Sequence, residues 1–152
     1  MNYTQDMNLL STSGYCMPFE EKDRDVQLTL RYGKQKHPKT GESFFHHGID
    51  FKTNNYFLAA VADGVVSGIG IDRKQYGLYV VIKYSKYEVT YSHMSNVFMQ
   101  FGQQVKAGLA VGVSSDLLHM EVKYDGEEID PVEFITMLYG NAKTWSEKGK
   151  AQ

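Results

Sequence analysis

Two short segments, far apart in the chain, carry residue types that could bind a metal ion. His46 and Asp50 stand four residues apart around Gly48, and His119 follows much later. Two imidazoles and one carboxylate are good ligands for Zn²⁺ and leave a fourth position for water. A further histidine, His93, could act on whatever such a metal binds. The pattern therefore indicates metal-assisted hydrolysis.

His46 and Asp50 can share one ion only if the chain bends between them. In a straight strand, residues four apart lie on one face but about 13 Å from each other. Zinc ligand atoms must come within about 2.0–2.2 Å of the ion. Gly48 allows a bend or bulge at low cost, and the neighbouring aromatic and β-branched residues disfavour a helix. An isolated His-x-x-x-Asp pair is more often an ordinary surface feature, so spacing alone leaves the metal site unproven.

Alternation over residues 117–124 predicts a β-strand with two different faces. The face that would pack on the core comprises Leu118, Met120, Val122 and Tyr124. The other face comprises Leu117, His119, Glu121 and Lys123. His119 would then point away from the core, as a ligand on the floor of a cleft would. Glu121 either orients His119 as a hydrogen-bond partner or is a solvated charge on the sheet.

Short runs rich in Val, Ile and Tyr, separated by turn residues, predict a mainly β, antiparallel domain. Alternation in one of them would place Tyr91 and His93 on one face of the strand. Asp125-Gly126 has the composition of a hairpin turn. The predicted strands cover residues 59–61, 65–70, 78–84, 87–93, 110–113 and 118–124.

One helix is marked near the end of the chain. Asp130 can cap it, Pro131 suits its first position, and Glu133 completes the capping pattern. An apolar stripe at helical spacing follows, and Gly140 is expected to end the helix. The predicted organisation is an N-terminal segment, 1–27, that packs on or leads into the domain; the domain itself, 28–140; and a polar tail, 141–152.

Composition narrows the class of protein. The 152 residues are 42% hydrophobic and 22% charged, as expected for a single globular domain. A net charge of −2 argues against a nucleic-acid partner. No apolar run reaches the roughly 20 residues of a membrane span, and the first residues lack the pattern of a secretion signal. Cys16 is the only cysteine, so it has no internal disulfide partner, and we expect it to pack as a small apolar residue.

With these residues assembled, residues 28–131 resemble the M23 family of zinc metallopeptidases, the LytM and lysostaphin type of peptidoglycan endopeptidase. Several motifs occur in the family's order. They are Tyr32-Gly33, 37–41, 46–50, 61–66, Tyr76-Gly77, 91–93, 102–108, 119–122 and 129–131. The resemblance implies an antiparallel sheet domain of the duplicated hybrid motif, or barrel-sandwich, type with a groove and a short C-terminal helix.

The resemblance also implies chemistry. It assigns a zinc ion to His46, Asp50 and His119, and it gives His93, within Tyr91-Ser92-His93, the role of stabilising the developing oxyanion or orienting the water. The implied partners are peptidoglycan stem peptides or cross-bridges. The implied location is the cell envelope or the outside of the cell, although the chain shows no signal peptide.

The chain departs from the family pattern at a catalytic position. The family has His-x-His on the strand that holds His119, and the first histidine is replaced here by Leu117, which can neither accept a proton nor hydrogen-bond a water. Residues 112–116 also make a short approach to this strand, and Gln35 replaces a usual arginine. Losing a positioned acid–base group typically costs about 10²–10⁴ in rate. Only His37, His47 or Asp116 could substitute, and only if one of them reaches the groove.

Three interpretations remain open at this point. The chain is a zinc endopeptidase with reduced or altered activity, or it is a degenerate module that keeps zinc and contacts cell wall or a partner hydrolase without cutting. A purely structural β domain without metal is the third.

Overall fold

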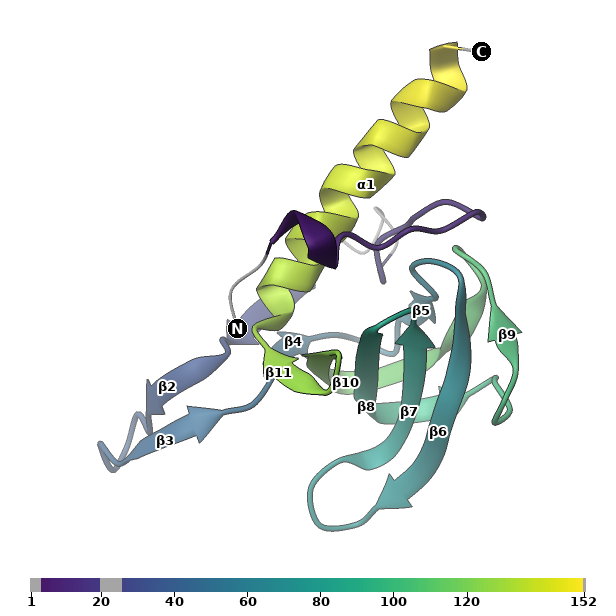
Figure 1. Ribbon diagram of the computed structural model, residues 1–152. Helices are drawn as coiled ribbons and strands as arrows, with labels where there is room; N and C mark the ends of the chain where they lie inside the picture. Colours follow the sequence, from purple (N-terminus) through teal and green to yellow (C-terminus); the bar gives the residue numbers. More distant parts are fainter. Residues whose placement is uncertain (1–3, 20–25, 152) are drawn as a thin grey trace.

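The computed structural model describes residues 4–19 and 26–151 and consists mainly of antiparallel strands with one long helix at the C-terminal end (Figure 1). Within this part of the chain, no helix is long and apolar enough to cross a membrane. The elements are η1 (Gln5–Met7), β1 (Gln27–Leu30), β2 (Gly33–Lys36), β3 (Ser43–His46), β4 (Ile49–Lys52), β5 (Phe57–Ala59), β6 (Gly64–Asp72), β7 (Gly77–Tyr84), β8 (Tyr87–Val97), β9 (Gln104–Val105), β10 (Ala110–Tyr124), β11 (Glu127–Ile129) and α1 (Pro131–Ala151).

The strands form one large open sheet in the order β1-β4-β10-β8-β7-β6-β9, with β5 and β11 also paired to β10. Strands β2 and β3 form a separate hairpin, which projects from the main sheet (Figure 1). The predicted antiparallel, mainly β fold is confirmed. Asp125 and Gly126 both have positive φ, which the predicted hairpin turn between β10 and β11 requires.

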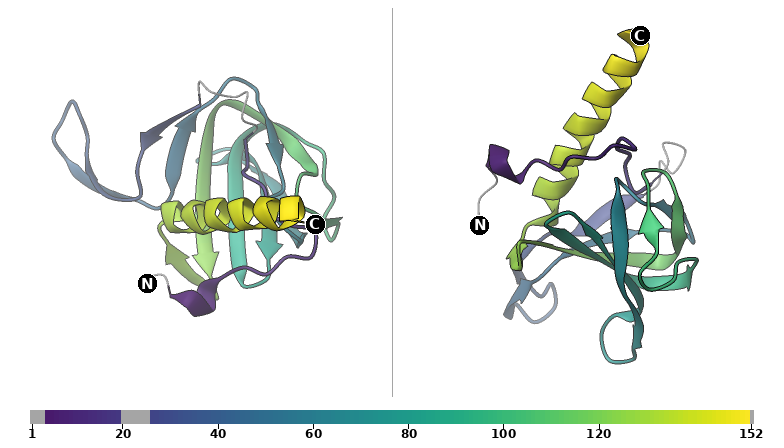
Figure 2. Two further views of the ribbon diagram at one scale, coloured as in Figure 1. Left: turned by 90° about the horizontal axis from the view of Figure 1, so that it is seen from above. Right: turned by 45° about the vertical axis from the view of Figure 1, so that its right-hand side comes forward.

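One face of the sheet packs on the core. Leu118, Met120 and Val122 are fully buried, as alternation predicts. Helix α1 covers this face, where the ring of Phe134 lies 4.9 Å from that of Tyr87, measured between centroids. Viewed from above, α1 lies across the strands (Figure 2). The opposite face of β7, β8 and β10 is left free to carry polar side chains.

Helix α1 begins as predicted but runs further than expected. Val132 N donates to Asp130 Oδ1 at 3.0 Å, so Asp130 is the cap. The helix passes through Gly140, which has no positive φ, and continues to Ala151. The predicted stop at Gly140 is therefore wrong, and residues 141–151 are helical. Asn141 Nδ2 donates to Asn8 Oδ1 at 2.9 Å, so contacts with the N-terminal segment hold the later turns in place.

Residues 4–19 pack along the domain. Met7 and Leu9 are buried in the core. Asp63 accepts a hydrogen bond from Thr12 N at 2.7 Å, and hydrogen bonds from Ser13 and Thr12 lower the pKa of Asp63 to about 2. The Cys16 thiol donates to a backbone carbonyl, and burial raises its pKa. This thiol is therefore a packed group of low reactivity.

Candidate metal centre

The structure brings the two distant segments together. His46 ends β3, Asp50 lies in β4, and Asp50 is the direct cross-strand partner of His119 in β10. One potential ligand atom from each of the three side chains lies within 4.8 Å of the others. Asp50 Oδ1 is 3.4 Å from His46 Nε2 and 2.6 Å from His119 Nδ1. All three donors therefore converge on one point.

Gly48 makes this convergence possible. It lies in the two-residue connection between β3 and β4, where the chain passes directly over β10. A Cβ atom at this position would overlap Met120 O and would lie 2.8 Å from His119 Cε1. The predicted bend at Gly48 is present. Glycine is required here by the close approach of two backbones. Its φ angle is not positive and therefore does not itself require glycine.

The donor set suits a divalent metal because each imidazole has one nitrogen already engaged. His46 Nδ1 lies 2.9 Å from the carbonyl oxygen of Arg31, and His119 Nε2 lies 2.8 Å from Glu121 Oε2. Each acceptor fixes the tautomer of its ring, which leaves His46 Nε2 and His119 Nδ1 free to face Asp50. This is the second-sphere pattern typical of histidines that ligate zinc.

Without an ion, the short contact between His119 and Asp50 needs a proton. Burial lowers the pKa of His119, but hydrogen bonds to Asp50 and Glu121 outweigh it and raise the pKa to about 9. A metal binding here would displace the proton shared by His119 and Asp50. Asp50 and Glu121 thus fix the orientation of the His119 ring with or without a metal ion.

A tyrosine completes the surroundings of His119. The Tyr76 ring stacks on the His119 ring, with centroids 6.0 Å apart and planes 28° apart. Its hydroxyl hydrogen-bonds Glu121, and burial together with the Glu121 charge raises the pKa of Tyr76 to about 12. Burial raises the pKa of Glu121, but its bonds to His119 and Tyr76 leave it lowered overall. Sequence reasoning gave Tyr76 no place in the site, although Tyr76-Gly77 is one of the motifs of the resemblance.

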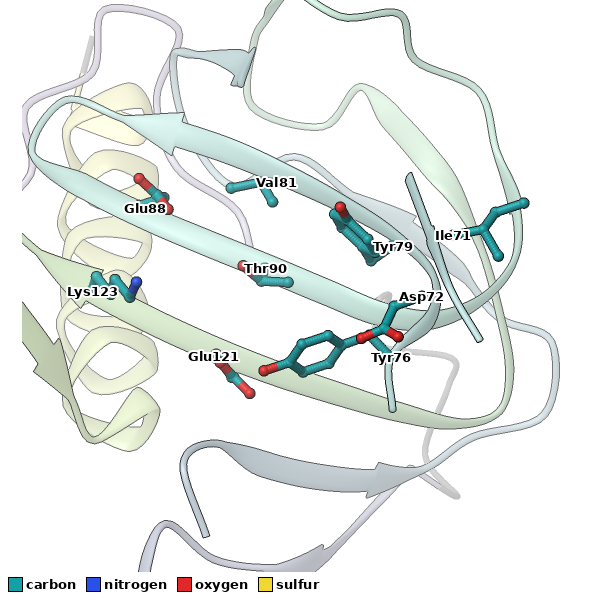
Figure 3. A pocket seen from close by; sticks show the side chains of 9 residues that line it. All are labelled: Ile71, Asp72, Tyr76, Tyr79, Val81, Glu88, Thr90, Glu121 and Lys123. Atoms are coloured by element: carbon teal, nitrogen blue, oxygen red, sulfur yellow. The ribbon is translucent and has the colours of Figure 1, made fainter. Parts of the chain in front are cut away.

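A cavity of about 480 Å³ opens beside this group on the free face of the sheet. Figure 3 shows its lining, with the Tyr76 hydroxyl pointing toward Glu121. The residues that line it are Ile71, Asp72, Tyr76, Tyr79, Val81, Glu88, Thr90, Glu121 and Lys123. Tyr76 and Glu121 therefore lie between the candidate ligand His119 and this cavity.

His93 reaches the site because of a β-bulge. It has no cross-strand partner on either side of β8, and its φ is +61°. Its ring centroid lies 6.5 Å from that of His119. Burial and the nearby charge of His119 lower the pKa of His93, although Asp50 opposes this, so the ring favours its neutral form.

The bulge overturns one prediction from the sequence. Tyr91 and His93 were expected on one face of β8, but Tyr91 is fully buried in the core, where its hydroxyl lies 2.9 Å from that of Tyr84. The extra residue in the bulge reverses the alternation between these two positions. Period-two reasoning cannot detect such a reversal, since any single bulge shifts every side chain beyond it.

Leu117 lies beside the ligands. It pairs with Lys52, one step along from Leu118, so the ladder with β4 puts it on the same face as His119. Strand β10 is continuous from Ala110 to Tyr124, which agrees with the short approach seen in the sequence.

The three side chains that could replace a base at this position lie elsewhere. His47 points outward with 60% of its side chain exposed, and its Nδ1 lies 2.8 Å from Glu128 Oε1. The His37 ring lies in the turn between β2 and β3, where it accepts from the backbone of Lys39. The Asp116 side chain is exposed to solvent.

Comparison with known families places the chain. Residues 44–131, more than half of the chain, match the sequence model of Peptidase family M23. The chain belongs to this family. Membership implies a metal, and the three converging side chains are the described group that could hold one.

Two curated relatives have sequences similar to this chain. An uncharacterized metalloprotease of Haemophilus influenzae is 29% identical over 107 residues, which cover 64% of this chain and 22% of the relative. The murein hydrolase activator NlpD of Escherichia coli K12 is 31% identical over 96 residues, which cover 58% of this chain and 25% of the relative. The chain thus spans about a quarter of the length of the curated relatives it matches.

Solved structures agree with the fold. A zinc-containing peptidase from Vibrio cholerae superimposes with a TM-score of 0.66 at 26% identity, over 77% of this chain and 39% of that one. The catalytic domain of lysostaphin from Staphylococcus simulans gives a TM-score of 0.65 at 20% identity, over 78% of this chain and 98% of that one. The predicted LytM and lysostaphin type of fold is therefore confirmed.

Proposed function

We propose that this chain is a zinc metalloendopeptidase-like domain that acts on peptide cross-links of bacterial peptidoglycan, with hydrolysis impaired by Leu117. The observation that carries the proposal is the convergence of His46, Asp50 and His119, with His93 close by. A cavity lies beside this group, and its lining includes Glu121, the hydrogen-bond partner of His119. The expected site of action is the cell envelope. Relatives named as a murein hydrolase activator, as a lipoprotein and as an outer membrane antigenic lipoprotein support that location.

The three ligand residues and His93 would have different roles. His46 Nε2, Asp50 and His119 Nδ1 would hold the ion. A bound Zn²⁺ lowers the pKa of a coordinated water toward neutrality and polarises a peptide carbonyl. His93, neutral and close to His119, would orient the water or donate to the developing oxyanion.

Leu117 is the reason to expect weak activity. It occupies the place where the family carries a proton-accepting histidine, and a leucine side chain has no atom that can accept a proton. The alternative bases His37 and His47 are held away from the ligands. Substrate binding and metal binding would survive this change, whereas proton transfer would not.

One preparation tests the proposal. Zinc content is measured on protein purified without chelator, and the same sample is incubated with purified peptidoglycan while released peptides are followed by mass spectrometry. We expect about one zinc per chain and slow release of cross-link peptides, reduced further by His93→Ala with the zinc content unchanged. Absence of zinc would contradict the proposal, because all chemistry assigned here depends on the ion.

A second function is favoured by one observation. The likeness to proteins named as murein hydrolase activators suggests a module that keeps zinc and the groove but regulates a partner hydrolase. In that case the protein binds zinc and peptidoglycan, releases no peptides at any enzyme concentration, and raises the rate of an added cell-wall amidase. The same two assays therefore separate the two functions.

A further inference from the structure

We propose that Glu121 and Tyr76 are positioning residues that fix the metal-binding orientation of His119. This inference rests on the proposed function, because it concerns ligation of a metal by His46, Asp50 and His119. It adds two residues outside the ligand set, one of which comes from a different part of the sheet.

The two histidine ligands are held in different ways. His46 donates to a backbone carbonyl, Arg31 O, at 2.9 Å. His119 instead pairs with a side chain, Glu121, at 2.8 Å. A backbone acceptor is fixed by the strand, but a glutamate side chain has three rotatable bonds and holds a ring only if it is itself held. The orientation of His119 therefore depends on what restrains Glu121.

Tyr76 provides that restraint. Its hydroxyl points toward the Glu121 carboxylate (Figure 3), and its ring stacks on the His119 ring at a centroid distance of 6.0 Å. Tyr76 is in the connection between β6 and β7, and its carbonyl oxygen accepts from His93 N at 2.8 Å. The backbone of Tyr76 is thus fixed by the bulge in β8, while its side chain lies beside Glu121, which itself bonds to His119.

The surroundings of Glu121 show why this restraint is needed. Glu121 lines the cavity, and its side chain keeps 19% of its surface exposed. A carboxylate on the wall of an open space can turn toward solvent. If it turned, His119 would lose the acceptor at Nε2, and either ring nitrogen could then face Asp50. Only one of these two ring orientations directs Nδ1 toward Asp50 and His46.

The test measures metal affinity rather than activity. Zinc dissociation constants are determined by competition with a chromogenic chelator for Glu121→Ala, Glu121→Gln and Tyr76→Phe. Loss of a second-sphere partner typically weakens metal binding by about 10–100-fold, and we expect this for Glu121→Ala. We expect a smaller loss for Glu121→Gln, which can still accept from Nε2, and about 2–10-fold for Tyr76→Phe, which keeps the ring but loses the hydroxyl.

A spectroscopic readout distinguishes positioning from a general structural role. Cobalt replaces zinc, and its visible absorption reports the geometry of the ligands. We expect the Glu121 variants to shift or broaden these bands, with partial recovery in Glu121→Gln. Thermal unfolding in the presence of a chelator identifies any variant that fails to fold, and the isosteric Glu121→Gln then decides the outcome.

Two matched controls come from the same cavity. Glu88 and Tyr79 line it, but in the described contacts neither bonds to His119 or Glu121. Glu88→Gln and Tyr79→Phe should leave zinc affinity and the cobalt spectrum unchanged. Unaltered zinc affinity in the Glu121 variants would overturn this inference and leave the proposed function standing. A starting protein that binds no zinc would instead overturn the proposed function, and this inference with it.

Discussion

The two sides of the candidate site are built very differently. On the ligand side, β4 and β10 pair in unbroken register from Leu117 to Met120, and each histidine ligand has an orienting partner. On the side that would move protons, the ladder between β8 and β10 is interrupted between Ser114 and His119. His93 lies in a bulge at this point. Leu117 occupies the position where the family carries its other catalytic histidine.

Under the proposed function, this difference means that holding a metal and using it would be separable in this sheet. The ligands depend on a regular ladder and on one glycine, whereas the acid–base groups depend on irregular backbone and on single side chains. One substitution can therefore remove proton transfer and leave the ligand set intact. The predictions below test that separation, from the largest expected effect to the smallest.

Restoring the missing base should have the largest effect. Leu117→His places an imidazole on the same face as His119, and a positioned acid–base group is worth about 10²–10⁴ in rate. We expect peptidoglycan hydrolysis to rise by this factor with unchanged zinc content, measured by clearing of a cell-wall suspension. Leu117→Asn is the control, since it is polar but cannot act as a base at neutral pH. No gain in the histidine variant, with zinc bound, would show that the two sides are not separable in this way.

Adding one methyl group at Gly48 should damage the ligand side. In Gly48→Ala the new Cβ would overlap Met120 O and His119 Cε1, and such overpacking costs about 1–3 kcal/mol. We expect lower stability in urea and a loss of zinc binding. Gly140→Ala is the matched control, because nothing beyond the neighbouring backbone of its own helix lies within 4 Å of its added Cβ. That change should stabilise the helix by about 0.5–1 kcal/mol.

Removing the metal should weaken the fold by a comparable amount. A ligand present at a hundred times its dissociation constant stabilises the native state by about 2.7 kcal/mol. We expect a chelator to lower the free energy of unfolding accordingly, measured by urea titration with and without zinc. Asp50→Asn should abolish the zinc-dependent difference, and a variant that keeps it would show that the ion binds elsewhere.

The smallest effect is a pH dependence of the chelated protein. The pKa of His119 is raised to about 9 from an ordinary 6.5, so its contribution to stability is fully present below about pH 6.5 and is lost as pH rises through about 9. We expect the free energy of unfolding to fall across this range. With saturating zinc this loss should disappear, since the ion replaces the proton. Urea titrations at several pH values measure both curves.

Much of the fold followed from local pattern. Alternation identified the buried face of β10, Asp125-Gly126 marked the hairpin, and Asp130 marked the start of α1. The end of α1 did not follow, because contacts between Asn141 and the N-terminal segment hold the later turns. Such contacts join the two ends of the chain and leave no local pattern.

The site was predictable only in part. The resemblance singled out His46, Asp50, His119 and His93, and the structure places all four side chains near one another. The opposite orientations of Tyr91 and His93 could not be foreseen, since a bulge has no fixed sequence requirement. Tyr76 was missed because its role depends on the path of the connection between β6 and β7.

The packing of residues 4–19 sets the smallest piece of this chain that can be expected to fold. Met7 and Leu9 fill the core beside the helix, and Thr12 and Ser13 clamp Asp63. A protein trimmed to residues 44–131, the bounds of the family match, would lack residues 4–19 and nearly all of α1. Both of these cover the aromatic side chains around Tyr84 and Tyr87. Proteolytic nicking within residues 4–19 should have a similar outcome, with aggregation following cleavage far from any metal ligand.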